Sequence, residues 1–309
     1  MSLPTVSVVV PVYNEEKCLP ELIRRMSALR EQILEGFELE LILVDDGSTD
    51  RSREMLRNFS IENEWIEIRL LMRNFGHQIA VTAGMDVALT DYVAVIDGDL
   101  QDPPELIPAM IQQLITNGDH IVYGQRVVRD GESLFKLWSA RFFYRLIRHS
   151  SRLDIPLDTG DFRVMTRRAR DIISEMREHN RFLRGMAPWT GLKSSSFLYS
   201  RDIRYAGTTK YTLGKMFTLA FNAIVSFSTT PLRAMQVLGL ILAAFGLIGV
   251  GVALFVATFG DSAIGLGLLA SLNMLSTGVV VAALGIVGGY VHRIQDEVRG
   301  RPLYLIEES

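Results

Sequence analysis

The chain contains a single cysteine, Cys18, among its 309 residues. One thiol cannot form a disulfide within the chain, and it cannot supply the thiolate cluster of a structural zinc site. The formal net charge is only −3, so there is no excess of positive charge for a phosphate backbone. These shortages exclude a disulfide-stabilised protein and give no reason to expect a nucleic acid partner.

Several common signatures are also missing. The first residues, "MSLPTVSVVVPVYNEE", have neither the basic start nor the long apolar core of a signal peptide, so we expect the catalytic part in the cytosol. No G-x-G-x-x-G follows the first apolar run, and no G-x-x-x-x-G-K-[ST] occurs. A standard dinucleotide site and a P-loop are therefore not expected.

Charge is missing from two long stretches near the C-terminus. No charged residue lies between Arg233 and Asp261, and a second uncharged run extends from Ser262 to Val291. Each run exceeds the roughly 20 apolar residues that cross a bilayer as a helix. We therefore predict two transmembrane helices within residues 232–292. The alternative is a pair of unusually long buried helices in a soluble core.

The charges that flank these runs predict their orientation. The connecting loop carries only Asp261, whereas cationic residues stand at the outer ends: Arg233 before the first run, and His292, Arg293, Arg299 and Arg301 after the second. Positively charged flanks stay on the cytoplasmic side of a membrane. We expect a membrane hairpin with both termini in the cytosol and a cytosolic tail over residues 293–309.

Residues 5–230 alternate short apolar runs with segments of helical length. The predicted strands are Thr5–Val10, Glu40–Val44, Ile66–Leu71, Tyr92–Ile96 and His120–Tyr123. The predicted helices between them are Cys18–Leu34, Asp50–Phe59, Gly76–Leu89 and Glu105–Thr116. Apolar strands that alternate with helices in this way are typical of a doubly wound, mostly parallel α/β sheet.

Polar motifs follow four of the predicted strands: "PVYNEE", "DDGSTD", "RNFGHQ" and "DGDLQD". Ligands of doubly wound sheets bind beyond the carboxyl ends of the strands, where these motifs would meet. In the last motif Asp97, Asp99, Gln101 and Asp102 crowd together, and carboxylates at this spacing repel one another unless a cation lies among them. The pattern favours a divalent-cation site over the alternative, a solvated acidic turn.

These motifs also carry a family resemblance. The stretches "VVVPVYNEE", "LVDDGSTD", "RNFGHQIAVTAGMD" and "VIDGDLQDPPE", in this order, resemble the family 2 glycosyltransferases with a GT-A fold. Within that family the chain is similar to the polyprenyl-phosphate glycosyltransferases, which include dolichyl-phosphate mannose synthases and bacterial bactoprenol glucosyltransferases. The resemblance implies a cytosolic GT-A domain over residues 1–212, and the two C-terminal runs match the bacterial branch.

The resemblance also implies a metal site and a catalytic acid. Asp97, Asp99 and Gln101 would bind Mg²⁺ or Mn²⁺ against the diphosphate of a nucleotide sugar, and Asp99 is also counted as catalytic. Asp161, in "DTGDFR", matches the position of an acidic catalytic residue in inverting relatives. We expect Asp161 to orient the reactants or accept a proton, with Arg163 as its partner.

A nucleoside pocket is implied in the same way, formed by Pro11, Tyr13, Glu15, Asp45 and Asp46. A carboxylate can accept the ribose hydroxyls or a base N–H, although Asp45 also fits a turn-forming role in "DDGS". We expect structural roles for four polar residues nearby: Ser48 and Asp50 in a turn and helix cap, Asp102 at the end of its loop, and His77 in support of the site.

The acceptor of these relatives is a lipid monophosphate, whose oxygen is already mostly ionised at neutral pH, so cationic side chains matter more than a strong base. We assign Arg126, Lys136 and Arg141 to the lipid phosphate, and Arg204 and Lys210 to the donor diphosphate. The alternative for each is a solvated surface charge. The segment "LFKLWSARFFYRLIRH" and residues 213–231 are expected at the membrane interface, with an ordinary core-facing helix as the alternative for the first.

The predicted reaction is an inverting, metal-dependent transfer of a sugar, with glucose favoured, from a UDP-sugar to undecaprenyl phosphate in the bacterial cytoplasmic membrane. The sugar is alternatively N-acetylglucosamine, mannose or a modified pentose. Two further alternatives are a processive polysaccharide synthase, whose Q-x-x-R-W motif and additional spans are missing here, and an inactive membrane scaffold. The expected partners are the nucleotide sugar, the polyprenyl phosphate and membrane lipid, and the resemblance also allows a homo-oligomer such as a tetramer.

Overall fold

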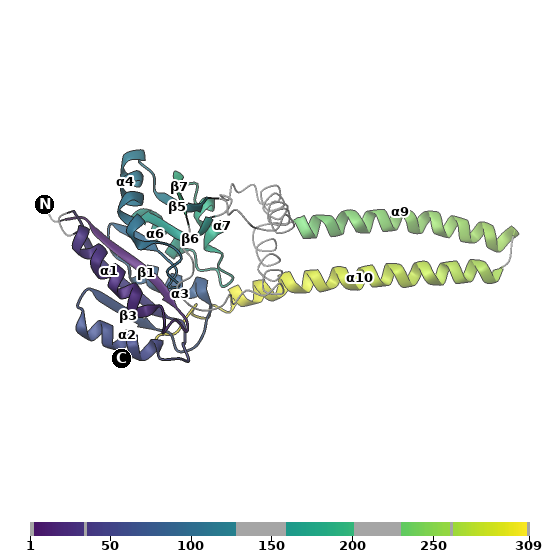
Figure 1. The fold of residues 1–309 in the computed structure, drawn as a ribbon. Helices are drawn as coiled ribbons and strands as arrows, with labels where there is room; N and C mark the ends of the chain where they lie inside the picture. The colour runs from purple at the N-terminus through teal and green to yellow at the C-terminus, as the bar shows by residue number, and fades with distance from the viewer. Residues whose placement is uncertain (1–2, 34–35, 128–158, 201–229, 260–261, 308–309) are drawn as a thin grey trace. The chain divides into compact units, whose positions relative to one another are not determined.

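A computed structural model of the chain describes residues 3–33, 36–127, 159–200, 230–259 and 262–307. These residues belong to two compact units. The N-terminal unit carries a sheet with its helices and also includes the residues from Pro302 onward, whereas the C-terminal unit contains the two longest helices (Figure 1).

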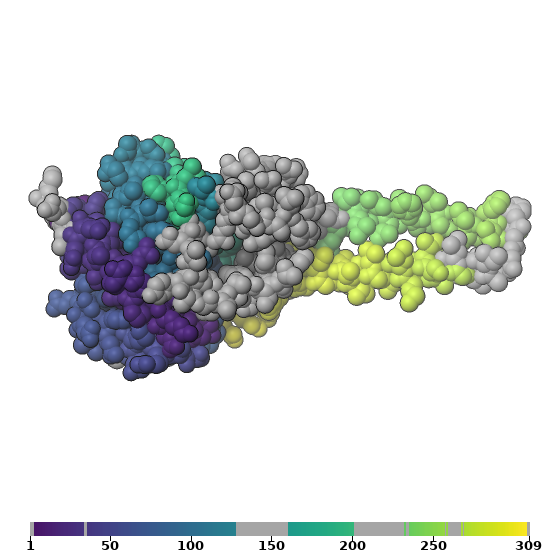
Figure 2. All heavy atoms as spheres, viewed as in Figure 1, coloured from purple at the N-terminus to yellow at the C-terminus, as the bar shows by residue number. Residues whose placement is uncertain are grey.

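The C-terminal unit consists of α9 (Thr230–Phe259) and α10 (Ser262–Val298). Their segments Met235–Val256 and Leu269–Val298 have mean hydropathies of 2.6 and 1.9 and are long enough to cross a membrane. Side chains of both helices form the surface of this unit in Figure 2. Only 6% of the most apolar window of α9, and none of the most apolar window of α10, is buried. This exposure contradicts the alternative of two buried core helices.

The two long helices also approach each other closely. A Cβ added at Gly249 of α9 would lie 2.7 Å from Leu272 Cδ1 of α10. The absence of a side chain at Gly249 therefore allows this contact between the helices. Because α10 continues to Val298, the first residues of the predicted 293–309 tail are helical.

The N-terminal unit is built on a seven-stranded sheet with the order β3-β2-β1-β4-β6-β5-β7. The strands are β1 (Thr5–Val12), β2 (Glu38–Asp45), β3 (Ile66–Leu70), β4 (Tyr92–Val95), β5 (Ile121–Arg126), β6 (Thr159–Thr166) and β7 (Ser194–Tyr199). All neighbouring strands are parallel except that β6 runs antiparallel to β4 and β5. The predicted GT-A-type, mostly parallel sheet is thus confirmed.

Helices connect these strands. Those of the N-terminal unit are α1 (Leu19–Ile33), α2 (Ser52–Glu62), α3 (His77–Val87), the 3-10 turn η1 (Pro104–Leu106), α4 (Ile107–Asn117), α6 (Arg167–Glu175) and α7 (Leu183–Trp189). The four predicted helices are present with shifted ends. The elements β6, β7, α6 and α7 were not predicted, because polar residues interrupt the apolar pattern of stretches such as "TGDFRVMT" and "SSSFLY".

Pairing and loop contacts explain the shifted boundaries. β1 and β2 run past their predicted ends because the pairing continues to Val12 and Asp45. α2 begins at Ser52 rather than Asp50, and Asp50 Oδ1 accepts a hydrogen bond from Ser52 N at 3.0 Å. Asp50 therefore supports the first turn of α2 from outside the helix.

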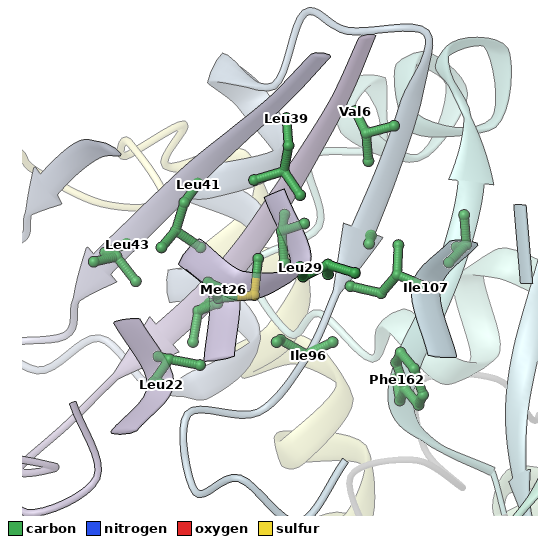
Figure 3. Packing of buried hydrophobic residues seen from close by; sticks show 14 of the residues in the cluster. Val6, Leu22, Met26, Leu29, Leu39, Leu41, Leu43, Ile96, Ile107 and Phe162 are labelled. Carbon is green, nitrogen blue, oxygen red and sulfur yellow. The ribbon is translucent and has the colours of Figure 1, made fainter. Parts of the chain in front are cut away.

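One face of the sheet packs against α1 (Figure 3). Alternate residues of β2, Leu39, Leu41 and Leu43, share a buried cluster with Leu22 and Met26 of α1. This matches a two-residue period in the strand and a four-residue period in the helix. The resulting core holds the central strands, whose ends carry the polar loops.

The central strands also contact α3, through residues that alternate with those of the α1 cluster. A Cβ added at Gly84 would lie 2.4 Å from Val9 Cγ1 and 3.0 Å from Val44 Cγ2. Glycine is therefore needed for α3 to lie this close to β1 and β2. The close approach fixes α3, whose first residue is His77.

Candidate active site

The carboxyl ends of the parallel strands β1, β2 and β4 lie side by side along one edge of the sheet, the edge formed by strand ends rather than by an outermost strand. Because β6 is antiparallel, its amino end reaches the same edge. The β4–β6 register pairs Val95 with Arg163, and the same register two residues further brings Asp97 level with Asp161. Two predicted site residues that are distant in sequence are thus neighbours across the sheet.

Asp161 lies at the centre of a polar network and is 4% exposed. Its Oδ2 lies 3.1 Å from His77 Nε2 and accepts a hydrogen bond from Gln78 Nε2 at 3.3 Å. Arg184 Nε donates to Oδ1 and Arg184 Nη2 donates to Oδ2, each at 3.1 Å. Arg163 Nη2 donates to Oδ1 at 3.1 Å, the pairing that was predicted. Both carboxylate oxygens are therefore held from several sides.

These contacts set the protonation of the network. Burial disfavours the charged form of His77, but the hydrogen bond to Asp161 and the charge of Asp97 raise the pKa of His77 to about 9. Burial also opposes ionisation of Asp161, yet the Arg184 guanidinium and His77 hold the pKa of that carboxyl well below its usual range. At neutral pH an imidazolium therefore faces an ionised Asp161.

Asp97 is a second carboxylate beside His77, with 3.5 Å between His77 Nε2 and Asp97 Oδ1. Burial and the neighbouring carboxylates raise the pKa of Asp97 to about 6, although the His77 charge acts in the opposite direction. One ligand atom each from His77, Asp97 and Asp161 lie within 4.8 Å of one another. A cation bound here would relieve the repulsion among these carboxylates.

The other two predicted metal ligands, Asp99 and Gln101, lie on the loop after β4 and are 9% and 8% exposed. Gln101 N donates to Asp99 Oδ1 at 3.2 Å. Leu100 between them has a φ of 60°, a left-handed conformation that is strained for leucine and that often occurs in functional loops. Carboxylate and amide oxygens are ligands that Mg²⁺ and Mn²⁺ prefer, so the donor set fits a hard divalent cation.

The loop after β4, which we call the metal loop after its predicted role, ends at Asp102, which is fully buried and accepts a hydrogen bond from Tyr199 Oη. Arg126 Nε donates to the same Tyr199 Oη at 3.4 Å, and Arg126 Nη2 lies 3.9 Å from Asp102 Oδ1. These contacts fit the structural role predicted for Asp102. They hold Arg126, which was assigned to the lipid phosphate, beside the metal loop.

The predicted nucleoside residues lie on the loops after β1 and β2 and at the strand ends. Pro11 is inside β1, Tyr13 is exposed just after it, and Glu15 N donates to Ser52 Oγ at 2.9 Å. The two loops are tied together by Asn14, whose N donates to Ser48 Oγ at 3.0 Å. The turn role predicted for Ser48 fits this contact.

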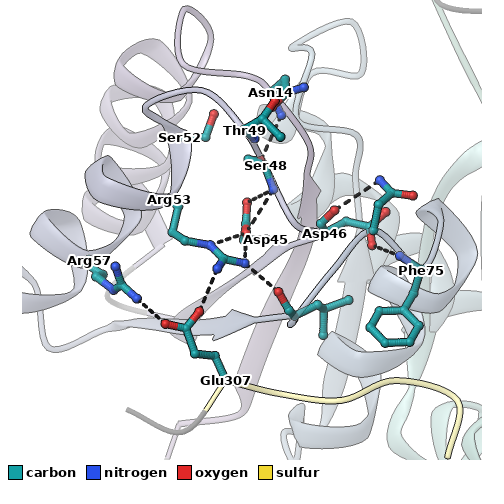
Figure 4. A network of polar contacts seen from close by, with 12 residues as sticks. Asn14, Asp45, Asp46, Ser48, Thr49, Ser52, Arg53, Arg57, Phe75 and Glu307 are labelled. Carbon is teal, nitrogen blue, oxygen red and sulfur yellow. Dashed lines mark hydrogen bonds and ion pairs between the residues drawn. The ribbon is translucent and has the colours of Figure 1, made fainter.

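The two aspartates at the end of β2 hold neighbouring loops (Figure 4). Asp45 is fully buried, and each of its oxygens accepts a hydrogen bond from Ser48 N at 3.2 Å. Asp46 Oδ1 accepts from Phe75 N at 2.7 Å and Oδ2 accepts from Gly76 N at 3.0 Å, and burial raises the pKa of Asp46. These contacts fit the turn-forming alternative for Asp45, and its contact with a nucleotide stays a prediction.

Several predicted residues lie outside the described part of the chain. They are the cations Lys136, Arg141, Arg204 and Lys210, the segment "LFKLWSARFFYRLIRH" and residues 213–229. Their assignments to the phosphates and to the membrane interface stay predictions.

Arg184 was not among the predicted site residues, and His77 was predicted only to support the site. Arg184 lies on α7 in "RFLRGM", where no motif or spacing marks it, and it reaches Asp161 only through tertiary packing. His77 carried a usable signal, because it stands in the polar motif after β3, at the same edge of the sheet as the other motifs.

The fold and the acidic residues at the carboxyl ends of its strands agree with the family that the motifs predict. Residues 7–173 match the model of glycosyl transferase family 2, and the chain belongs to that family. It is therefore a glycosyltransferase, as its motifs predicted.

Particular relatives narrow this class. The chain is 43% identical over 304 residues to a protein named uncharacterized glycosyltransferase YkcC of Bacillus subtilis (strain 168). This alignment covers 98% of this chain and 93% of the relative. It is 35% identical over 306 residues to the SfII prophage-derived bactoprenol glucosyl transferase of Shigella flexneri, which covers 98% of both chains. A solved mycobacterial protein, 20% identical and covering 73% of this chain and 75% of its own, aligns with a TM-score of 0.50 and supports the fold alone.

Proposed function

We propose that this protein transfers a sugar, with glucose favoured, from a UDP-sugar to undecaprenyl phosphate. The observation that carries the proposal is the 35% identity, over 98% of both chains, to a protein named a bactoprenol glucosyl transferase. The site chemistry supports it, because acidic ligands for a cation lie beside the positively charged Arg184 and His77, which are suited to phosphate groups.

In this proposal Asp97, Asp99 and Gln101 hold Mg²⁺ or Mn²⁺. When bound, the cation stabilises the negative charge of the departing diphosphate. Support comes from the oxygen donors of the loop and from the burial and neighbouring carboxylates that raise the pKa of Asp97. His77 contributes by pairing with Asp97, and Asp161 holds the His77 ring in place.

Asp161 acts in the proposal by orientation rather than as a nucleophile. Its oxygens accept hydrogen bonds from the guanidinium groups of Arg163 and Arg184, and a covalent glycosyl ester would have to break several of them. The acceptor phosphate is already ionised, so it attacks the anomeric carbon from the face opposite the departing diphosphate. One displacement of this kind inverts the anomeric centre.

We also propose that α9 and α10 form a hairpin in the bacterial cytoplasmic membrane, with the N-terminal unit in the cytosol. The seven-stranded sheet, which precedes α9 in the chain, and the residues from Pro302 onward belong to the same folded unit, and one folded unit lies on one side of a membrane. The chain would therefore cross an even number of times. The cationic residues outside the two helices favour the cytosolic side.

The test is turnover by the purified full chain in detergent with a short polyprenyl phosphate and Mg²⁺ or Mn²⁺. The donors are UDP-glucose, UDP-N-acetylglucosamine, GDP-mannose and a UDP-pentose, and mass spectrometry of the lipid reports the product. We expect a lipid-linked hexose from UDP-glucose and release of UDP. No lipid-linked sugar from any donor would contradict the proposed acceptor, and product from another donor alone would correct the sugar.

The same product tests the stereochemistry. An α-linked donor sugar should appear as a β-linked sugar on the lipid phosphate, because a single displacement inverts the anomeric carbon. The coupling constant of the anomeric proton in the NMR spectrum distinguishes the two. An α-linked product, or a glycosyl adduct on Asp161 in the mass spectrum of the protein, would overturn the single displacement.

A further inference from the structure

The residues after α10 return to β3, the strand at one edge of the sheet. Ile306 forms an antiparallel bridge with Leu71, and Glu307 N donates to Leu70 O at 2.8 Å. These contacts cover part of an edge that would otherwise expose unpaired backbone groups. The segment Tyr304–Glu307 lies within the cytosolic tail predicted for residues 293–309. From here on we call only this segment the tail.

The tail carries a carboxylate that bridges two arginines of α2 (Figure 4). Glu307 Oε2 lies 2.7 Å from Arg53 Nη1, and Oε1 lies 2.8 Å from Arg57 Nη2. Arg53 and Arg57 are one helical turn apart, so both reach the same group. The Arg53 side chain is 24% exposed and the Arg57 side chain is 50% exposed, so solvent screens the Arg53–Glu307 ion pair less than the Arg57–Glu307 ion pair.

Arg53 connects this carboxylate to a second one that is buried. Its Nε donates to Asp45 Oδ2 at 2.9 Å, and its Nη2 lies 2.8 Å from the same oxygen. A carboxylate that is fully buried, as Asp45 is, is costly unless it is paired. Glu307 binds Nη1 and Leu71 O accepts a hydrogen bond from Nη2 at 2.5 Å, and together these contacts keep the guanidinium turned toward Asp45.

Asp45 in turn shapes the loop after β2. Its carboxylate fixes Ser48 N, and the adjacent Asp46 holds the backbone just before α3. We propose that Glu307 is a positioning residue for the nucleotide part of the donor: the tail holds Arg53, Arg53 holds Asp45, and the loop keeps the shape that binds the nucleotide. The inference rests on the proposed function, because it takes this loop as part of the donor site.

The experiment compares Glu307→Gln with Glu62→Gln in the full chain. Glu62 is exposed at the end of the same α2 helix, so its variant loses the same charge without touching Arg53. Glu307→Asp, which keeps the carboxylate, is the conservative variant. The measurements are kcat, KM for the UDP-sugar that supports turnover, and the Kd of UDP by calorimetry.

We expect Glu307→Gln to raise KM and the Kd of UDP by roughly two- to fivefold, which corresponds to the free energy that a partly exposed ion pair contributes. The kcat should be nearly unchanged. The KM and Kd of Glu307→Asp should lie closer to the wild-type values, and those of Glu62→Gln should equal the wild-type values. A Glu307→Gln variant with wild-type KM and UDP affinity, or with a lower kcat alone, would overturn the positioning role while the proposed function stands. A wild-type protein that neither binds UDP nor turns over a UDP-sugar would instead overturn the proposed function, and this inference with it.

Discussion

The acidic loop after β4 concentrates its charge in residues that contribute little to the hydrophobic core. Asp99 is 9% exposed, and its Oδ1 accepts a hydrogen bond from the backbone N–H of Gln101 on the same loop. Its removal should therefore affect chemistry more than folding. The positive φ of Leu100 beside it has the same implication, because backbone strain is retained where function requires the geometry.

Asp99→Ala is expected to lower transfer by roughly 100-fold or more, with little change in Tm, because a group that stabilises the departing charge is lost. Asp99→Asn is the matched variant, since it keeps an acceptor for Gln101 N and removes only the charge. Lipid-linked sugar formation and thermal unfolding in detergent provide the two measurements. Full turnover by either variant, or wild-type turnover that persists in excess chelator, would refute the metal assignment.

In the protein without a bound metal, the protonated imidazole of His77 lies between the carboxylates of Asp97 and Asp161. Its pKa of about 9 in the folded chain lies above the ordinary value of 6.5, so protonation stabilises the fold below pH 6.5. That contribution disappears as the pH rises through about 9. In chelator, His77→Gln should therefore lower Tm clearly at pH 6 and much less at pH 9.5. An equal loss of Tm at both pH values would contradict the charged state of His77.

At the scale of the elements, α3 depends on one close contact with the sheet. A side chain at Gly84 would collide with Val9 and approach Val44. Alanine normally stabilises a helix relative to glycine by about 1 kcal/mol, whereas overpacking a core costs about 1–3 kcal/mol. The collision should outweigh the helix preference here.

Gly84→Ala should accordingly lower Tm by about 2–4 °C, the shift expected for about 1 kcal/mol in a domain of this size. The control is the double variant Gly84→Ala with Val9→Ala, which removes the colliding methyl groups. Its loss of Tm should be smaller than the sum of the two single variants, because the residues are in contact. Additive losses would show that the contact with Val9 does not limit the packing of α3.

At the scale of the whole molecule, the returning tail and the two apolar helices bear on one question, which side of the membrane each end occupies. The tail pairs with β3 and Glu307 pairs with α2, so the residues from Pro302 onward share a folded unit with the sheet that precedes α9. The proposed hairpin therefore places both ends of the helix pair on one side of the membrane.

The hairpin predicts opposite accessibility for two introduced cysteines. Asp261→Cys should react with an impermeant thiol reagent added outside intact cells, and Arg299→Cys should react only after the cells are permeabilised. The native Cys18 is buried and should not interfere. Equal protection of both positions before permeabilisation would refute the hairpin.

The sequence by itself determined the central strands, the metal loop and the two candidate spans. These features follow from local patterns: apolar runs in β1, β2 and β4, aspartates crowded after β4, and long stretches without charge. Such patterns can be read without knowing which segments meet, because burial, repulsion and membrane crossing depend on the composition of one short stretch.

Only the tertiary structure decided which distant groups act together. The antiparallel pairing of β6 set Asp161 level with Asp97, and the packing of α7 brought Arg184 to both Asp161 oxygens. The return of the chain to β3 placed Glu307 on Arg53. Strand pairing and the reach of an arginine side chain depend on segments far apart in the sequence, so no local pattern encodes these contacts.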